Sequence, residues 1–118
     1  MKYILLIYGD ERAWGAMSQA EMEQIHADHH TYGTAMGKAG VIEGGSELKP
    51  TTTATSVKFS GGRTRTVDGP FAETKEQLAG FYLIDVPSLD EALAWAEKMP
   101  GMLEGTVEIR PLAKPASF

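Results

Sequence analysis

Two segments of this chain carry apolar side chains on both faces of a predicted strand. Residues 2–8 read KYILLIY, and residues 81–86 read FYLIDV, interrupted only by Asp85. Runs rich in β-branched and aromatic residues favour strands, and a strand that is apolar on both sides is typical of a sheet covered on both sides. Each segment is therefore predicted to form a strand that is buried on two sides.

Two helices are predicted from capping boxes, in which a serine and a glutamate three residues later satisfy free amide groups at a helix start. The first box is Ser18–Glu21, so a helix begins near Gln19 after a loop that holds Trp14 and Gly15, and Gly40 lies where a left-handed stop is expected. The second box is Ser88–Glu91, and its helix ends before the Pro-Gly pair at residues 100–101. Apolar and aromatic positions at steps of three and four mark the buried face of the first helix: Met22, Ile25, His29, Tyr32 and Met36.

More polar strands complete the pattern at residues 41–48, 54–60, 63–67 and 105–110. The pair Gly61-Gly62 predicts a tight hairpin between the second and third of these strands. The order is then strand, helix, strand, hairpin, strand, helix, strand, which is two βαβ-like halves. We expect an α+β fold in a single domain over residues 1–118: a ferredoxin-like antiparallel sheet with two helices on one face and a β-hairpin insertion.

The second face of such a sheet needs a cover that the chain itself does not supply. Both helices lie on one face, yet residues 2–8 and 81–86 are apolar on the other face as well. The chain has no large tail, and a ligand alone is small. Two sheets stacked face to face in a homodimer are the simplest cover, so we expect the protein to have a second copy of itself as partner.

Composition excludes several classes of protein. Lysine and arginine number 11 and aspartate and glutamate 16, so 11 − 16 gives a net charge of −5, which argues against nucleic acid or an anionic membrane as partner. With 0 cysteines, disulfides, thiol nucleophiles and thiolate metal sites are excluded. The apolar run at the start is too short for a signal peptide or a membrane span, and we expect a cytoplasmic protein.

Residues 68–76, DGPFAETKE, resemble the DGPF group of the YCII-related proteins. The resemblance extends along the chain through residues 2–11 (KYILLIYGDE), 80–82 (GFY), 90–92 (DEA) and 107–111 (VEIRP). It implies a dimeric α/β barrel of ferredoxin-like protomers. It also implies two different functions, because a His–Asp pair in a pocket is suggested as an enzymatic site in YCII-like relatives, whereas DGPF-group members often neighbour sigma factors of the extracytoplasmic-function type.

The candidate catalytic residues are histidines of the first helix and the aspartate of the DGPF segment. His29 lies in the core stripe, where a packed role and a general acid–base role are both open. His26 and His30 lie on one flank of the helix, and two imidazoles alone do not make a metal site. If a helix histidine, His29 or His26, converges with Asp68, the pair forms a proton-transfer site. Asp68 can equally accept a hydrogen bond from a backbone amide within its own turn.

Two glycines lie on the same flank of the first helix as His26 and His30. Gly33 and Gly37 lower helix propensity, and we expect them to allow close packing of the helix against the sheet or a ligand.

The candidate substrate-binding residues are charged or aromatic side chains near predicted strand ends: Glu73, Lys75, Arg110 and Tyr82. Arg110 suits an anionic substrate in bidentate fashion or an ordinary surface ion pair. Tyr82 is a core or interface candidate as well. The chain shows no nucleotide-binding loop, nucleophile elbow or zinc signature, so we expect no cofactor and no metal.

Two functions stay open from the sequence, and so does the question whether the protein is an enzyme. The first is a cofactor-independent enzyme that uses a His–Asp pair for acid–base chemistry on a small polar molecule. The alternative is a non-catalytic dimer that binds a small-molecule ligand or a partner protein linked to sigma-factor regulation.

Overall fold

The computed structural model describes residues 1–113. Its secondary structure runs in the order β1 (Lys2–Gly9), α1 (Glu11–Gly15), α2 (Gln19–Lys38), β2 (Ile42–Glu47), the 3₁₀ turn η1 (Thr51–Thr53), β3 (Thr55–Ser60), β4 (Arg63–Asp68), β5 (Gln77–Asp85), α3 (Leu89–Glu97) and β6 (Thr106–Pro111). The chain is therefore of the α+β class, as expected. None of the described helices combines the length and apolar character needed to cross a bilayer.

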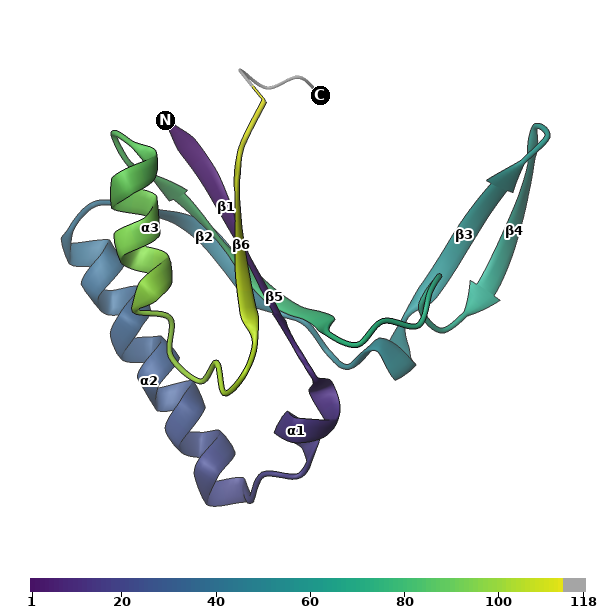
Figure 1. The fold of residues 1–118 in the computed structure, drawn as a ribbon, viewed down its shortest axis with the longest axis horizontal. Helices are drawn as coiled ribbons and strands as arrows, with labels where there is room; N and C mark the ends of the chain where they lie inside the picture. Colours follow the sequence, from purple (N-terminus) through teal and green to yellow (C-terminus); the bar gives the residue numbers. More distant parts are fainter. Residues whose placement is uncertain (114–118) are drawn as a thin grey trace.

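The main sheet has four antiparallel strands in the order β2-β5-β1-β6. β1 and β5, the two segments that are apolar on both faces, lie side by side at its centre, and α2 and α3 cover one face (Figure 1). This arrangement is consistent with the expected ferredoxin-like fold. The sheet is open, with β2 and β6 at its edges, so a closed barrel is not a property of the single chain.

The hydrophobic core lies between the sheet and the two helices. Alternate residues of β1, namely Tyr3, Leu5 and Ile7, point toward the helices and are buried. They meet Tyr32 and Met36 of α2, so the deepest part of the predicted core stripe is confirmed. Leu5 and Met36 are fully buried, and each such side chain contributes about 1.5–3 kcal/mol of transfer free energy.

The sequence signals at the ends of α2 are confirmed. Ser18 Oγ accepts from the amide of Glu21 at 3.1 Å, and the Ser18 amide donates to Glu21 Oε1 at 2.9 Å, which completes the capping box. Gly40 adopts a φ of 72°, the left-handed conformation that ends the helix.

Two predicted boundaries were wrong, one because of a local helix cap and one because of strand pairing. The loop expected around Trp14 contains the short helix α1, because Asp10 accepts from the Arg12 amide at 2.9 Å and caps it. β5 begins at Gln77 rather than at residue 81, because Tyr8 and Gly9 of β1 pair with Leu78 and Gln77. Pairing with β1 therefore extends β5 toward its N-terminal end, into residues 77–80, which were not predicted to belong to the strand.

β3 and β4 form a separate two-stranded hairpin, called the arm below (residues 55–68), that projects from the body of the molecule (Figure 1). Gly61 and Gly62 form its turn with φ values of 57° and 78°, as predicted from the Gly-Gly pair. The radius of gyration is 16.1 Å. A compact chain of this length has about 13.5 Å, so the projection of the arm accounts for an extended shape.

The face of the main sheet opposite the helices carries Ile4, Leu6, Phe81 and Leu83. Leu6 pairs with Phe81 and Ile4 with Leu83, which forms an apolar strip across the two central strands. All four side chains are only half-buried, and within residues 1–113 α2 and α3 pack on the other face. The predicted uncovered face is therefore present in the single chain.

The expectation of close packing at Gly33 and Gly37 was wrong. A Cβ built at either position has no neighbouring atom within 4 Å, so the sheet does not approach the helix there.

We predict that Gly37→Ala raises the free energy of unfolding by about 1 kcal/mol, the difference in helix propensity between glycine and alanine. Urea denaturation measures the change. Gly80→Ala is the matched control, because its Cβ would lie 2.8 Å from the carbonyl oxygen of Ser46 and would push β2 away from β5. We expect that variant to lose stability. A loss of stability in Gly37→Ala would contradict the open surroundings described here.

Candidate functional site

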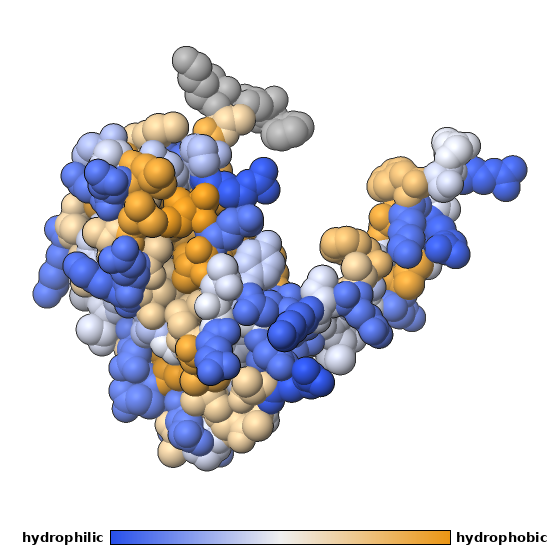
Figure 2. Space-filling view, viewed as in Figure 1, coloured by the Kyte–Doolittle hydropathy of each residue, from blue (hydrophilic) through white to orange (hydrophobic). Residues whose placement is uncertain are grey.

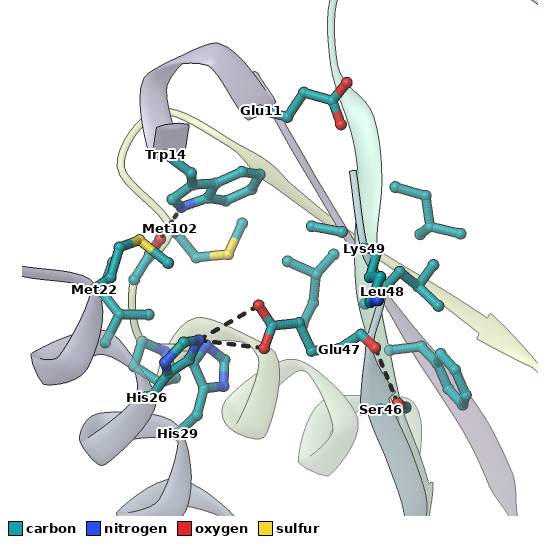
Figure 3. A pocket seen from close by; sticks show the side chains of 18 of the residues that line it. Glu11, Trp14, Met22, His26, His29, Ser46, Glu47, Leu48, Lys49 and Met102 are labelled. Carbon is teal, nitrogen blue, oxygen red and sulfur yellow. Dashed lines mark hydrogen bonds and ion pairs between the residues drawn. The ribbon is translucent and has the colours of Figure 1, made fainter. Parts of the chain in front are cut away.

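A pocket of about 610 Å³ lies between α1, α2 and the β2–β5 end of the sheet, on the helix side (Figure 3). Its volume lies within the range of small-molecule sites. Much of its wall is apolar and comes from α1, α2, the sheet and the loop before β6: Ile7, Trp14, Met22, Ile25, Leu78 and Met102. Polar groups from α2, β2 and β5 complete the lining: His26, His29, Glu47 and Tyr82.

Helix α1 closes one side of the pocket and is held at both ends. The amide of Glu11 donates to the side-chain oxygen of Gln77 at 2.9 Å, and the Glu11 carboxylate accepts from the amide of Thr51 at 3.0 Å and from its hydroxyl. The indole nitrogen of Trp14 donates to the carbonyl of Gly101 at 3.0 Å. The pocket wall at Trp14 is therefore tied to β5, to η1 and to the loop after α3.

His29 and Tyr82 form the closest polar contact between α2 and the sheet within the pocket. His29 Nδ1 lies 2.8 Å from the Tyr82 hydroxyl, and the two rings are nearly parallel at 15° with centroids 6.0 Å apart. Tyr32 packs against both rings in T-shaped contacts, and its own hydroxyl donates to the carbonyl of Trp95 at 2.6 Å. Both side chains of the pair are therefore held in place by aromatic packing.

Burial sets the protonation states of this pair. Desolvation lowers the pKa of His29, and a hydrogen bond to the backbone carbonyl of Pro100 opposes part of that shift. Burial raises the pKa of Tyr82. At neutral pH the imidazole is therefore neutral and the phenol protonated. Nδ1 faces the Tyr82 hydroxyl, so in the neutral tautomer that carries its proton on Nε2, Nδ1 is the acceptor and the Tyr82 hydroxyl the donor.

His26 and Glu47 form a second pair that crosses from α2 to β2, as the dashed lines in Figure 3 show. His26 Nε2 lies 3.2 Å from Glu47 Oε2, and the two side chains are 55% and 67% exposed. Exposed pairs of this kind contribute little to stability. Their position in the lining places a carboxylate and an imidazole where a bound molecule meets solvent.

The structure brings only some of the sequence-predicted site residues together. His29, His26 and Tyr82 line the pocket. Asp68 lies on β4 opposite Thr55 in the arm, is exposed, and is not among the described residues that line the pocket. The expected convergence of a helix histidine with Asp68 is therefore not found within residues 1–113, where Glu47 and Tyr82 are the partners of the two histidines.

The other predicted substrate-binding residues lie elsewhere. Lys75 lines a second, smaller pocket together with Glu76 and Glu104, and Glu73 is exposed in the loop before β5. Arg110 pairs with Ile4 across β1 and β6, on the face of the sheet away from the pocket. These three side chains therefore do not share a site with His29.

Sequence reasoning missed Glu47, Trp14 and Glu11 as members of the site. Glu47 lies 21 residues beyond His26 in the chain, and only the return of β2 along β5 brings the two together. Trp14 lies in a segment that was expected to be an irregular loop. Among residues 1–113, no group of three or more His, Cys, Asp or Glu side chains lies close enough to hold a metal ion.

Comparison with known proteins places this chain in a family. The family model described as the YCII-related domain matches residues 1–114. The chain belongs to the YCII-related family. A protein of Rhizobium meliloti (strain 1021), named uncharacterized protein R00369, is 44% identical over 115 residues, which cover 96% of this chain and 93% of the relative. That name states no activity, so the function of this YCII-related domain has to be argued from its pocket.

We predict that the depressed pKa of His29 makes the protein lose stability as the pH falls below about 6.5, the ordinary histidine value. In that range the unfolded chain binds a proton that the native state resists, so the free energy of unfolding decreases until the folded-state pKa is reached. Urea denaturation at about pH 7.5 and about pH 5.5 measures the loss. His29→Gln removes this group, and we expect that variant to lose less; equal losses would contradict the buried, neutral imidazole.

We also predict that Gly9→Ala opens the wall of the pocket. A Cβ at residue 9 would overlap the indole ring of Trp14, which must then leave its place against Gly101. The expected result is a shift of tryptophan fluorescence to longer wavelength as the ring enters water. Gly15→Ala is the control, because a Cβ there meets nothing within 4 Å. An unchanged spectrum in Gly9→Ala would show that Trp14 does not occupy this position.

Proposed function

We propose that the protein is an enzyme that moves a proton within a small organic molecule, with His29 and Tyr82 as the acid–base pair. The observation that carries the proposal is the 2.8 Å contact between His29 Nδ1 and the Tyr82 hydroxyl in the wall of the pocket. A neutral imidazole and a protonated phenol in contact are the forms that acid–base catalysis at neutral pH requires.

The proton step follows from the hydrogen-bond direction. The Tyr82 oxygen takes a proton from the substrate while the Tyr82 hydroxyl proton passes to His29 Nδ1, so one C–H or O–H bond of the substrate breaks and one N–H bond forms. The imidazolium that results is stabilised by the Pro100 carbonyl, which already raises the pKa of His29. Return of the proton to a different substrate atom completes an isomerisation with no net change in the enzyme.

The lining indicates the chemical class of the substrate. Apolar side chains such as Trp14, Met22 and Met102 suit a small apolar body, and methionines adapt to its shape. Glu47 and His26 provide an acceptor and a second imidazole for a hydroxyl or amine group at the pocket entrance. A small carbonyl compound with an acidic neighbouring C–H and one further polar group fits both the pocket and the proton step.

The proposal is tested by deuterium exchange. Small 1,3-diketones and α-hydroxy ketones are incubated with the protein in D₂O, and the loss of the α-carbon proton signal is followed by NMR. We expect acceleration for compounds that bind, and a decrease on the order of 10²-fold in His29→Gln and in Tyr82→Phe, the usual size of an acid–base contribution. Tyr8→Phe is the matched control, because Tyr8 pairs with Leu78 and Thr106 and lies outside the pocket lining.

Two outcomes would contradict the proposal. If compounds bind in the pocket without exchange, the protein is a binding protein, which is the alternative left open by the sequence. If Asp68→Asn abolishes exchange while His29→Gln retains it, the catalytic pair is the one expected from the sequence and not the one proposed here.

We propose in addition that the protein is a homodimer in which two uncovered sheet faces meet. The support is the apolar strip of Ile4, Leu6, Phe81 and Leu83 on the face opposite α2 and α3. Sedimentation velocity at micromolar concentration is the test: we expect a species of twice the chain mass, and a stable monomer would contradict the proposal. A partner linked to sigma-factor regulation stays a prediction from the family resemblance alone.

A further inference from the structure

The arm has two chemically different faces. Side chains alternate along a strand, so Val57 and Phe59 share one face with their partners Thr66 and Thr64. Lys58, Arg63 and Arg65 lie on the opposite face. Val57 is 54% exposed and Phe59 is 78% exposed, because within residues 1–113 this apolar face packs on no other element. Figure 2 shows hydrophobic side chains along the projecting hairpin.

Hydrogen bonds between its two strand ends close the root of the arm. The amide of Gly69 donates to the carbonyl of Ala54 at 2.7 Å, and Ser56 Oγ donates to the carbonyl of Gly69 at 2.8 Å. Gly69 has a φ of 97°, which a side-chain-bearing residue rarely adopts. The DGPF segment therefore serves as the root of the arm, and Phe71, which directly follows the root, is 77% exposed.

A two-stranded hairpin by itself is marginally stable in water. This one carries an exposed aromatic residue and an exposed valine on the same face, so burial of that face against another surface would stabilise it. The arm leaves the body on the side of the sheet that carries no helix (Figure 1). A second copy seated on the free sheet face would therefore lie within reach of the arm.

The opposite net charges of the arm and of the rest of the chain favour a second copy as the partner of the arm. Residues 55–68 contain Lys58, Arg63 and Arg65 against Asp68, so 3 − 1 gives +2 for the arm. The whole chain is −5, so −5 − 2 leaves −7 for the remaining residues. Two bodies of −7 repel each other, whereas an arm of +2 is attracted to a body of −7. The arm therefore supplies an attraction that the two bodies lack.

We propose that the arm of each copy embraces the body of the other, with Val57 and Phe59 packed against the second copy. This inference rests on the homodimer proposed above and adds the element that holds it together. It does not depend on proton transfer in the pocket. It assigns the hairpin insertion and the DGPF segment to assembly rather than to catalysis.

A photo-cross-link tests the contact directly. Phe59→p-benzoylphenylalanine places a photoreactive ring at the apolar face of the arm, and a mixture of ¹⁵N-labelled and unlabelled chains identifies links between copies by mass spectrometry. We expect mixed-isotope cross-linked dimers. Leu93→p-benzoylphenylalanine is the control, since Leu93 is 40% exposed on α3, away from the free sheet face. Links confined to one chain, or no more dimer than in the control, would overturn the proposal.

The strength of the dimer is the second measurement. In Val57→Ser with Phe59→Ser, we expect the dissociation constant from sedimentation equilibrium to rise about tenfold or more, as for loss of an aromatic anchor. Leu93→Ser should leave the constant within about twofold, and circular dichroism checks that each variant is folded. A monomeric wild-type protein would overturn the homodimer and the arm together. A dimer equally strong in the double variant would overturn the role of the arm alone.

Discussion

The antiparallel pairing of β1 with β5 is the interaction on which the rest of the structure depends. Its register sets Leu5 opposite Tyr82 and Leu6 opposite Phe81, so successive side chains of both strands point to opposite faces of the sheet. A slip of one residue would move Tyr82 away from α2 and would put Phe81 in its place. The hydrogen bond to His29 and the apolar strip on the free face are therefore two consequences of one register.

The pocket results from what is attached to the helix side of that sheet. α2 carries His26 and His29 along the side of the sheet on which Tyr82 points, and β2 returns along β5 to bring Glu47 to the entrance. α1 closes the wall because Glu11 is tied to Gln77 and Thr51. The polar groups of the site thus come from three different elements, and partial burial separates a neutral imidazole from the exposed His26–Glu47 pair.

In the proposed homodimer, the sheet face opposite the helices and the arm serve assembly, whereas the pocket serves catalysis. The strip of Ile4 and Leu83 and the exposed Phe59 are apolar surfaces that the single chain leaves uncovered. Their separation from the pocket explains why the DGPF segment, the most distinctive motif of the sequence, contributes no described side chain to the pocket lining. Family resemblance identified the motif, and the structure places its start at the root of the arm and not in the pocket lining.

Local signals in the sequence were sufficient for the capping box at Ser18, the stop at Gly40, the Gly-Gly hairpin and the two strands that are apolar on both faces, because each depends on neighbours along the chain. They also placed His29 on the buried stripe of α2. Only the tertiary structure decided that His29 meets Tyr82, 53 residues away, that His26 meets Glu47, and that Asp68 lies on a projecting arm. Contacts between distant segments follow from strand register and from the direction in which an insertion leaves the sheet, and neither leaves a periodic trace in the residues involved.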